Sequence, residues 1–135
     1  MSMLPDANEI RRKLIALALE IIEGQTPAID PALSLVRTYG MDSLDLLDFS
    51  FNIEELFGIR IGTDELRGRA KGMLQEEDMI DEEGCLSHEA LEIMKVQIPE
   101  IPSEQFVYGL RQEDIPGLLN INVFVRMVQE KLRKE

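Results

Sequence analysis

The chain has 135 residues, of which 44% are apolar and 30% are charged, so it can form one globular domain with an apolar core. Its formal net charge of −12 argues against nucleic acid and anionic membranes as partners, because both are polyanions, and favours partners with basic docking surfaces. The sequence lacks a membrane-length apolar run and a basic-then-apolar leader, and its single Cys85 cannot form an intrachain disulfide, so we expect a cytoplasmic protein without membrane insertion.

The first predicted helix begins after Asp6, because Asp6 and Glu9 have the spacing of a capping pair. Apolar residues then recur at helical spacing: Ile10, Leu14, Leu17, Ala18, Ile21 and Ile22. Gly24 is predicted to end this helix. Residues 24–42 contain Pro27, Pro31 and Gly40, which predicts a long loop with a turn of helix around 32–36.

A serine at the predicted start of the second helix is the most informative residue of the chain. Gly40 ends irregular backbone, and Asp42 and Ser43 are both helix-capping types, because a short side-chain oxygen accepts an orphan backbone N–H. The first helical turn therefore places the Ser43 hydroxyl beside unsatisfied N–H groups at the positive end of the helix dipole, which suits a phosphate. The simpler alternative is that Ser43 only caps the helix.

The second helix, predicted over about 43–57, carries two apolar stripes on opposite sides of a wheel with about 100° per residue. The inner stripe consists of Leu46, Phe49, Ile53, Leu56 and Phe57. The outer stripe consists of Leu44, Leu47 and Phe51, and carboxylates rim it: Asp45, Asp48, Glu54 and Glu55. A charged rim is typical of a docking surface more than of a core face. The alternative is that a later segment buries both stripes.

These residues resemble the acyl carrier protein family. That family carries Asp-Ser-Leu, preceded by a glycine, at the start of its second helix, and 4′-phosphopantetheine from coenzyme A is esterified to the serine. The matching tripeptide is Asp42-Ser43-Leu44, and Phe57–Ile61 is similar to the family's exit from this helix. The resemblance implies Ser43 as the attachment residue of the cofactor, with Asp42 and Leu44 as its binding neighbours.

The resemblance also implies partners and contact residues on the second helix. The partners would be a holo-carrier synthase, which is the phosphopantetheinyl transferase, and acyl-transferring or condensing enzymes with basic docking patches. The implied contact residues are Asp45, Leu47, Asp48, Phe51, Glu54 and Glu55. In the family the helices enclose an apolar pocket for the acyl chain, and Leu46, Phe49 and Ile53 are candidates to line it, although ordinary core packing explains them equally well.

After Ile61 the chain departs from the family pattern. A short third helix could begin in the run from Thr63 to Leu66, and the last helix is predicted after Asn120 as its cap, with a regular apolar stripe: Ile121, Phe124, Val125, Val128 and Leu132. The resemblance covers about 6–66 and 118–134. We therefore expect a single carrier-like domain over 1–135 with an insertion at about 68–119.

The predicted insertion has a helical pattern of its own. Ser87 could cap a helix that runs through Ile98, Ser103 could open a short helix, and Pro116-Gly117 predicts a turn into the last helix. Its apolar residues are too numerous for a solvated loop: Leu91, Met94, Ile98, Phe106, Val107 and Leu110. We expect a partly independent cover near Ser43 or the outer stripe that shifts when the arm is attached. The alternative is a decoration far from the arm.

Other chemistry fits the sequence less well. In a calcium loop counted from Asp78, the required glycine falls one position late, at Gly84. Cys85 and His88 lack a second Cys/His pair for zinc, so no metal site is expected. Ser43 as a hydrolase nucleophile needs a base, His88 is the single histidine, and the Gly-x-Ser-x-Gly elbow is absent.

The sequence thus predicts an all-α protein, an acyl-carrier-like helical bundle with extra helices between the third and last helix. By the resemblance it is a non-enzymatic acyl carrier that holds acyl intermediates as thioesters on a 4′-phosphopantetheine arm at Ser43, for fatty acid, lipid or polyketide-type synthesis. The alternatives are an unmodified docking adaptor with a carrier-like fold, and an aminoacyl or peptidyl carrier.

Overall fold

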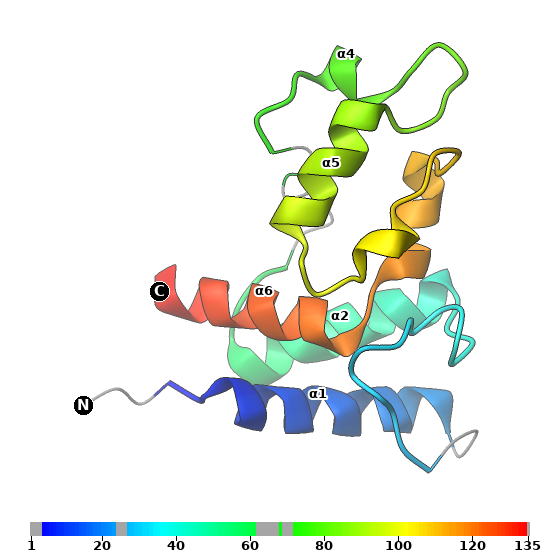
Figure 1. Ribbon diagram of the computed structural model, residues 1–135. Helices are drawn as coiled ribbons and strands as arrows, with labels where there is room; N and C mark the ends of the chain where they lie inside the picture. Colours follow the sequence, from blue (N-terminus) through cyan, green and yellow to red (C-terminus); the bar gives the residue numbers. More distant parts are fainter. Residues whose placement is uncertain (1–3, 24–26, 62–67, 69–71, 135) are drawn as a thin grey trace. The chain divides into compact units, whose positions relative to one another are not determined.

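The structure is a computed structural model that describes residues 4–23, 27–61, 68 and 72–134. The described residues form helices and turns without strands, which confirms the prediction of an all-α, acyl-carrier-like bundle (Figure 1). The chain divides into two compact units. Unit 1 is Met1–Ile61 with Leu119–Glu135, and unit 2 is Gly62–Leu118.

Unit 1 is built from helices α1 (Ala7–Ile22), α2 (Ser43–Phe57) and α6 (Ile121–Lys134). Helix α1 packs against both α2 and α6 (Figure 1). The core between them contains side chains with 0% exposed surface: Ile10, Leu14, Ala18, Leu35, Phe49, Ile53, Ile121 and Val128. At its centre the rings of Phe49 and Phe124 meet edge to face, with centroids 5.1 Å apart.

The predicted cap of α1 is confirmed, because the Asp6 carboxylate accepts a hydrogen bond from the Glu9 N–H at 2.8 Å. The helix ends at Ile22, and Glu23 adopts the left-handed conformation with φ 39° while its N–H donates to the carbonyl of Leu19. Gly24, which was predicted to end the helix, lies outside the described residues. Leu17 and Ile21 are half-buried, so the buried stripe is narrower than the apolar pattern.

The loop between α1 and α2 is fastened to the beginning of α6. The Leu35 N–H donates to the Leu119 carbonyl at 2.9 Å, the Asn122 N–H donates to the Pro31 carbonyl at 3.2 Å, and the Asn120 side-chain amide donates to the Ala32 carbonyl at 3.4 Å. The predicted helical turn around 32–36 was placed too early. The i to i−4 bonds run from Thr38 to Ser34 and from Gly40 to Val36, because Asp30 holds the preceding backbone in a turn through the Ala32 N–H.

Helix α6 begins where the apolar pattern predicted it. Asn120, 1% exposed, caps the helix by accepting the Val123 N–H at 2.9 Å. Most of the predicted stripe is buried, namely Ile121, Phe124, Val125 and Val128, whereas Leu132 in the last turn is half-buried. No described helix is long and apolar enough to cross a membrane.

Unit 2 contains α4 (Glu76–Met79), α5 (His88–Gln97) and the 3-10 helices η1 (Ser103–Gln105) and η2 (Gln112–Leu118). An isolated antiparallel bridge between Ile80 and Leu86 closes the loop between α4 and α5. The cap of α5 is as predicted, since the Ser87 hydroxyl accepts the Ala90 N–H. The core of this unit includes Met79, Leu86, Ala90, Leu91, Met94, Ile98, Ile101 and Phe106.

Two predictions for this segment were wrong in detail. The helix opened by Ser103 is a single 3-10 turn that ends at Gln105, and Val107, which was expected to pack, is 55% exposed. Pro116 and Gly117 lie within η2 instead of in a turn, because a proline lacks only the N–H and its φ suits a 3-10 helix. The predicted start of a third helix, from Thr63 to Leu66, lies outside the described residues.

Candidate functional site

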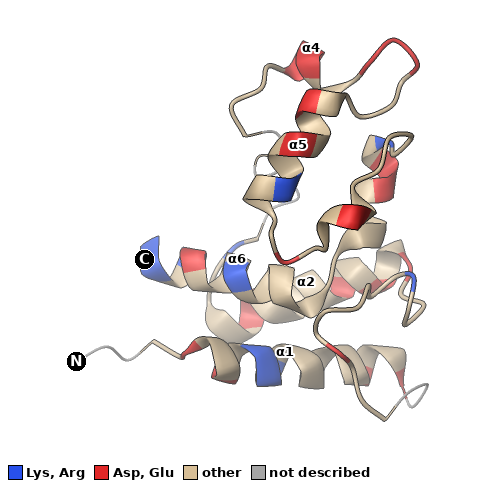
Figure 2. Ribbon diagram, viewed as in Figure 1, with Lys and Arg blue, Asp and Glu red and all other residues tan. Residues whose placement is uncertain are grey.

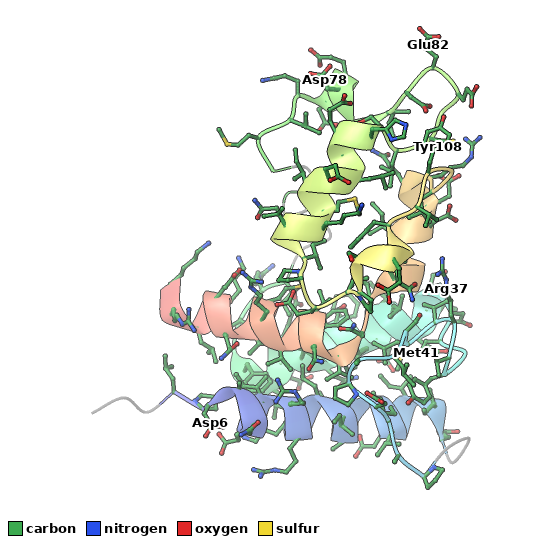
Figure 3. All side chains as sticks on the ribbon, viewed as in Figure 1. Asp6, Arg37, Met41, Asp78, Glu82 and Tyr108 are labelled. Atoms are coloured by element: carbon green, nitrogen blue, oxygen red, sulfur yellow. The ribbon has the colours of Figure 1, made fainter. Side chains whose placement is uncertain are left out.

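The backbone that leads into Ser43 is held by specific hydrogen bonds. Gly40 has a φ of +76°, a left-handed conformation that glycine adopts at little cost. The Met41 N–H donates to the Leu35 carbonyl at 3.1 Å, and the Met41 side chain is 2% exposed, so it anchors the chain in unit 1 two residues before Ser43 (Figure 3). This anchor fixes the position at which α2 begins.

A reciprocal capping box opens α2. The Asp42 carboxylate accepts the Asp45 N–H at 2.8 Å, and the Asp45 carboxylate accepts the Asp42 N–H at 3.1 Å. The Asp42 carbonyl accepts the Leu46 N–H. The N–H groups of Ser43 and Leu44 occupy the first two helical positions and therefore have no intrahelical acceptor.

Ser43 is the first residue of α2 and is exposed. Within the part of the chain that the structure describes, no hydrogen bond engages its hydroxyl, so the oxygen is available to a reagent from solvent. Asp42, and not Ser43, supplies the cap. The alternative in which Ser43 is only a capping residue is therefore wrong, because its neighbour has that role.

The outer stripe of α2 is exposed, with exposed fractions of 75% for Leu44, 46% for Leu47 and 58% for Phe51. On the inner stripe Phe49 and Ile53 are 0% exposed. The assignment of Leu56 to the inner stripe was wrong, because this residue is 47% exposed. Leu56 lies in the last turn of α2, and its position on the wheel, about 20° from the fully buried Phe49, does not account for its exposure.

The four carboxylates that rim the outer stripe have different surroundings. Asp48 and Glu55 are exposed, and Asp48 accepts a hydrogen bond from the Asn52 side-chain amide at 3.3 Å. Asp45 is engaged in the capping box, and Glu54 accepts the Ile61 N–H at 2.6 Å. Figure 2 shows acidic residues along α2. Asp48 and Glu55 are thus the two exposed carboxylates of this rim.

The role of Glu54 at the exit from α2 could not be read from the helical wheel. Gly58 ends the helix in the left-handed conformation, with its N–H bonded to the Glu54 carbonyl. The chain then turns back, so that the Glu54 carboxylate reaches the Ile61 N–H, seven residues on. A glycine directly after the helix and an extended Ile59–Ile61 run were the available signals. These signals predict a turn, but they do not predict which side chain accepts the hydrogen bond from the backbone N–H after the turn.

In unit 2 a hydrogen-bonded cross-link from Tyr108 joins two loops close to the residues that were considered for a metal site. The Tyr108 hydroxyl donates to the Asp81 carboxylate, and also to Glu83 at 3.2 Å. His88 stacks on the Tyr108 ring, with centroids 5.1 Å apart, and Cys85 is buried. Glu82 lies at the tip of this loop (Figure 3). The described residues contain no group of three or more acidic, His or Cys side chains arranged to hold a metal ion.

The same cross-link shifts two ionisation equilibria. The hydrogen bond from Tyr108 stabilises the charged carboxylate and so lowers the pKa of Asp81, and the Cys85 and Glu83 N–H groups add to this effect. The bond to Asp81 raises the pKa of Tyr108, because removal of the phenol proton would place two negative charges side by side. Arg111 adds two bonds across the loops, to the carbonyls of Gly84 and Glu83.

The comparison with known families matches the region that contains this site. A family model described as phosphopantetheine attachment site matches residues 12–68, which include α2, its capping box and most of α1. No curated protein and no solved structure matches the chain. A carrier domain of this kind interacts with a phosphopantetheinyl transferase and with the enzymes that use its cargo. Residues 12–68 therefore match a domain to which 4′-phosphopantetheine is covalently attached, which is consistent with the acyl carrier protein family.

Proposed function

We propose that Ser43 carries the phosphopantetheine arm and that the protein holds acyl intermediates on it as thioesters. These intermediates would serve fatty acid, lipid or polyketide-type synthesis, and separate enzymes would act on them. The observation that supports this most directly is the exposed Ser43 hydroxyl at the first position of α2, beside a capping box that leaves it unbound. The protein itself supplies no catalytic group in this proposal.

The attachment step requires an accessible hydroxyl and a partner that activates it. The Ser43 oxygen attacks the coenzyme A phosphorus that bears the pantetheine group. The new oxygen–phosphorus bond replaces the bond to the second phosphate, adenosine 3′,5′-bisphosphate leaves, and the hydroxyl proton passes to a base of the transferase. The unpaired N–H groups of Ser43 and Leu44, at the positive end of the α2 dipole, favour the charged product.

The outer stripe is the proposed docking surface for the transferase and the acyl-handling enzymes. Leu47 and Phe51 supply exposed apolar area, and Asp48 and Glu55 supply negative charge beside them. Complementary charge mainly raises the rate of encounter, whereas apolar contacts bury area once the partners have met. A basic partner surface with an apolar centre fits this arrangement.

Intact mass spectrometry tests this proposal. The wild-type protein, incubated with coenzyme A and a phosphopantetheinyl transferase, is expected to gain one phosphopantetheinyl group, and Ser43→Ala is expected to gain none. Ser50→Ala is the matched control, because it removes another serine hydroxyl from the same helix. If several transferases leave the wild type unmodified, the protein is an unmodified docking adaptor. If the adduct persists in Ser43→Ala, the attachment residue is elsewhere.

The cargo is tested separately, on protein purified from its native source. A mass corresponding to a fatty or polyketide-type acyl group on the arm would support the acyl role. An amino acid or peptide on the arm would instead identify an aminoacyl or peptidyl carrier.

A further inference from the structure

The interior of unit 1 is occupied by an aromatic pair at the place where α2 faces α6. The Phe49 and Phe124 rings meet at an interplanar angle of 77° and a centroid distance of 5.1 Å. This is the edge-to-face geometry that aromatic pairs prefer. Phe49 is 0% exposed and Phe124 is 4% exposed, so the pair lies inside the unit.

The described helices of unit 1 all contribute fully buried side chains to this core. A side chain that borders a space as large as a water molecule retains some accessible surface, yet core positions on all three helices of unit 1 have none. Those positions, each 0% exposed, are Ile10, Leu14, Ala18, Ile53, Ile121 and Val128. Leu46, which was a candidate pocket residue, lies only half-buried at the edge. The three predicted pocket residues thus split into two that pack the core and one at its margin.

We infer that Phe49 and Phe124 keep the acyl group outside the helical bundle, so that this carrier is suited to short or polar acyl groups. The inference rests on the proposed attachment of the arm at Ser43. A long alkyl chain needs shelter from water because exposed apolar surface is costly. To enter the bundle it would have to separate the two rings, and a close-packed interior resists added methylenes. A short chain, or one with hydroxyl or keto groups, loses less by remaining in water.

The test compares arms with different acyl groups on the same protein. An acetyl and an octanoyl group are loaded at Ser43 by a transferase from the corresponding coenzyme A thioesters, and loading is checked by mass. In the wild type, hydroxylamine is expected to cleave both thioesters at similar rates, and the Phe124 ring signals in NMR spectra are expected to be unchanged. An octanoyl thioester cleaved several-fold more slowly than the acetyl one, with shifted Phe124 signals, would overturn the inference.

A core variant and a matched control sharpen the comparison. Phe49→Ala opens space in the core, so its octanoyl thioester is expected to be cleaved several-fold more slowly than in the wild type, with shifted Phe124 signals. Phe49→Leu is the milder variant if Phe49→Ala does not fold. Leu56→Ala removes an apolar side chain from an exposed position of the same helix, outside the outer stripe, and is expected to behave as wild type. Equal cleavage in wild type and in a folded Phe49 variant would show that these rings do not decide where the chain lies.

A chemically attached chain separates this inference from the proposed function. In a Cys85→Ser background, Ser43→Cys can be alkylated with an iodoacetamide that carries an octyl group on a flexible linker as long as the arm. If no transferase loads Ser43, the proposed function fails, and the alkylated protein still reports on the core. Unchanged Phe124 signals would support exclusion of the alkyl chain, and shifted signals would contradict it.

Discussion

The backbone N–H of Leu35 donates a 2.9 Å hydrogen bond to the carbonyl of Leu119. This bond joins the loop before Ser43 to the residue that follows unit 2. The Leu35 carbonyl in turn accepts the Met41 N–H, two residues before Ser43. The start of α6 is therefore part of the support on which the attachment site rests, although it is distant in sequence.

Asn120 is expected to stabilise both ends of this connection. Asn120→Ala removes the cap on the Val123 N–H and the donor to the Ala32 carbonyl, and should lower the free energy of unfolding by about 1–2 kcal/mol, as measured in urea. Hydrogen exchange at the Leu35 and Met41 N–H groups should be faster. Asn120→Ser keeps a capping oxygen and should recover part of the loss. Equal stability of Asn120→Ala and wild type would contradict this role.

Asp48 is expected to guide the transferase to the outer stripe. Asp48→Lys should slow modification of Ser43 at low salt and weaken its salt dependence, because the exposed charge acts over about 10 Å at 0.1 M salt. Stability should change by no more than about 0.5 kcal/mol. Glu20→Lys makes the same charge change at an exposed position of α1 and should leave the rate near that of wild type. If the two variants are modified equally fast, the outer stripe is not the docking surface.

Glu54 is expected to act in folding and not mainly in docking. Glu54→Ala leaves the part-buried Ile61 N–H without its acceptor and should destabilise unit 1 by about 1–3 kcal/mol. Glu54→Gln keeps an acceptor oxygen and removes the charge, so it should retain more of the stability. Denaturation in urea measures both. A Glu54→Gln variant with native stability and slow modification by the transferase would instead show that its charge contacts the partner.

The cross-link between Tyr108 and Asp81 is expected to lose strength at both extremes of pH. Because the pKa of Asp81 is lowered, its contribution is present above the unfolded pKa and is lost as the pH falls through the folded value. Because the pKa of Tyr108 is raised, its contribution is present below the unfolded pKa and is lost as the pH rises through the folded value. Phenolate absorbance in a Tyr39→Phe background should show Tyr108 titrating at lower pH when Asp81→Asn is added. An unchanged titration would contradict the bond.

The local signals in the sequence predicted the helix starts well. Asp6, Asp42, Ser87 and Asn120 all cap the helices that follow them, because a capping oxygen acts on an N–H only three residues away. The apolar periodicity also predicted the three helices of unit 1 and the outer stripe, because it too depends only on residues close together in the sequence. The presence of a phosphopantetheine-attachment domain followed from a short run around Ser43.

Features that depend on tertiary contacts could not be predicted in the same way. The turn in the α1–α2 loop lies later than expected, since three hydrogen bonds to residues 119–122 fix that loop. Val107 is exposed, and η1 and η2 are 3-10 helices. Both features depend on the packing of unit 2, which the apolar periodicity does not encode. The single-domain organisation, the placement of unit 2 near the arm and the docking residues stay predictions.

The pairing of Phe49 with Phe124 also bears on how the protein is made. Phe124 belongs to α6, which is synthesised after the whole of unit 2, so during translation α1 and α2 wait for their third partner while Phe49 lacks the ring that covers it. The long connection between α2 and α6 lowers the equilibrium stability only slightly, because each doubling of the length of a connecting loop costs only about 0.6 kcal/mol. Its effect is on timing: the Leu35–Leu119 bond forms only after residue 119 is made, so the transferase meets a finished Ser43 site only after unit 2 and α6 have been synthesised.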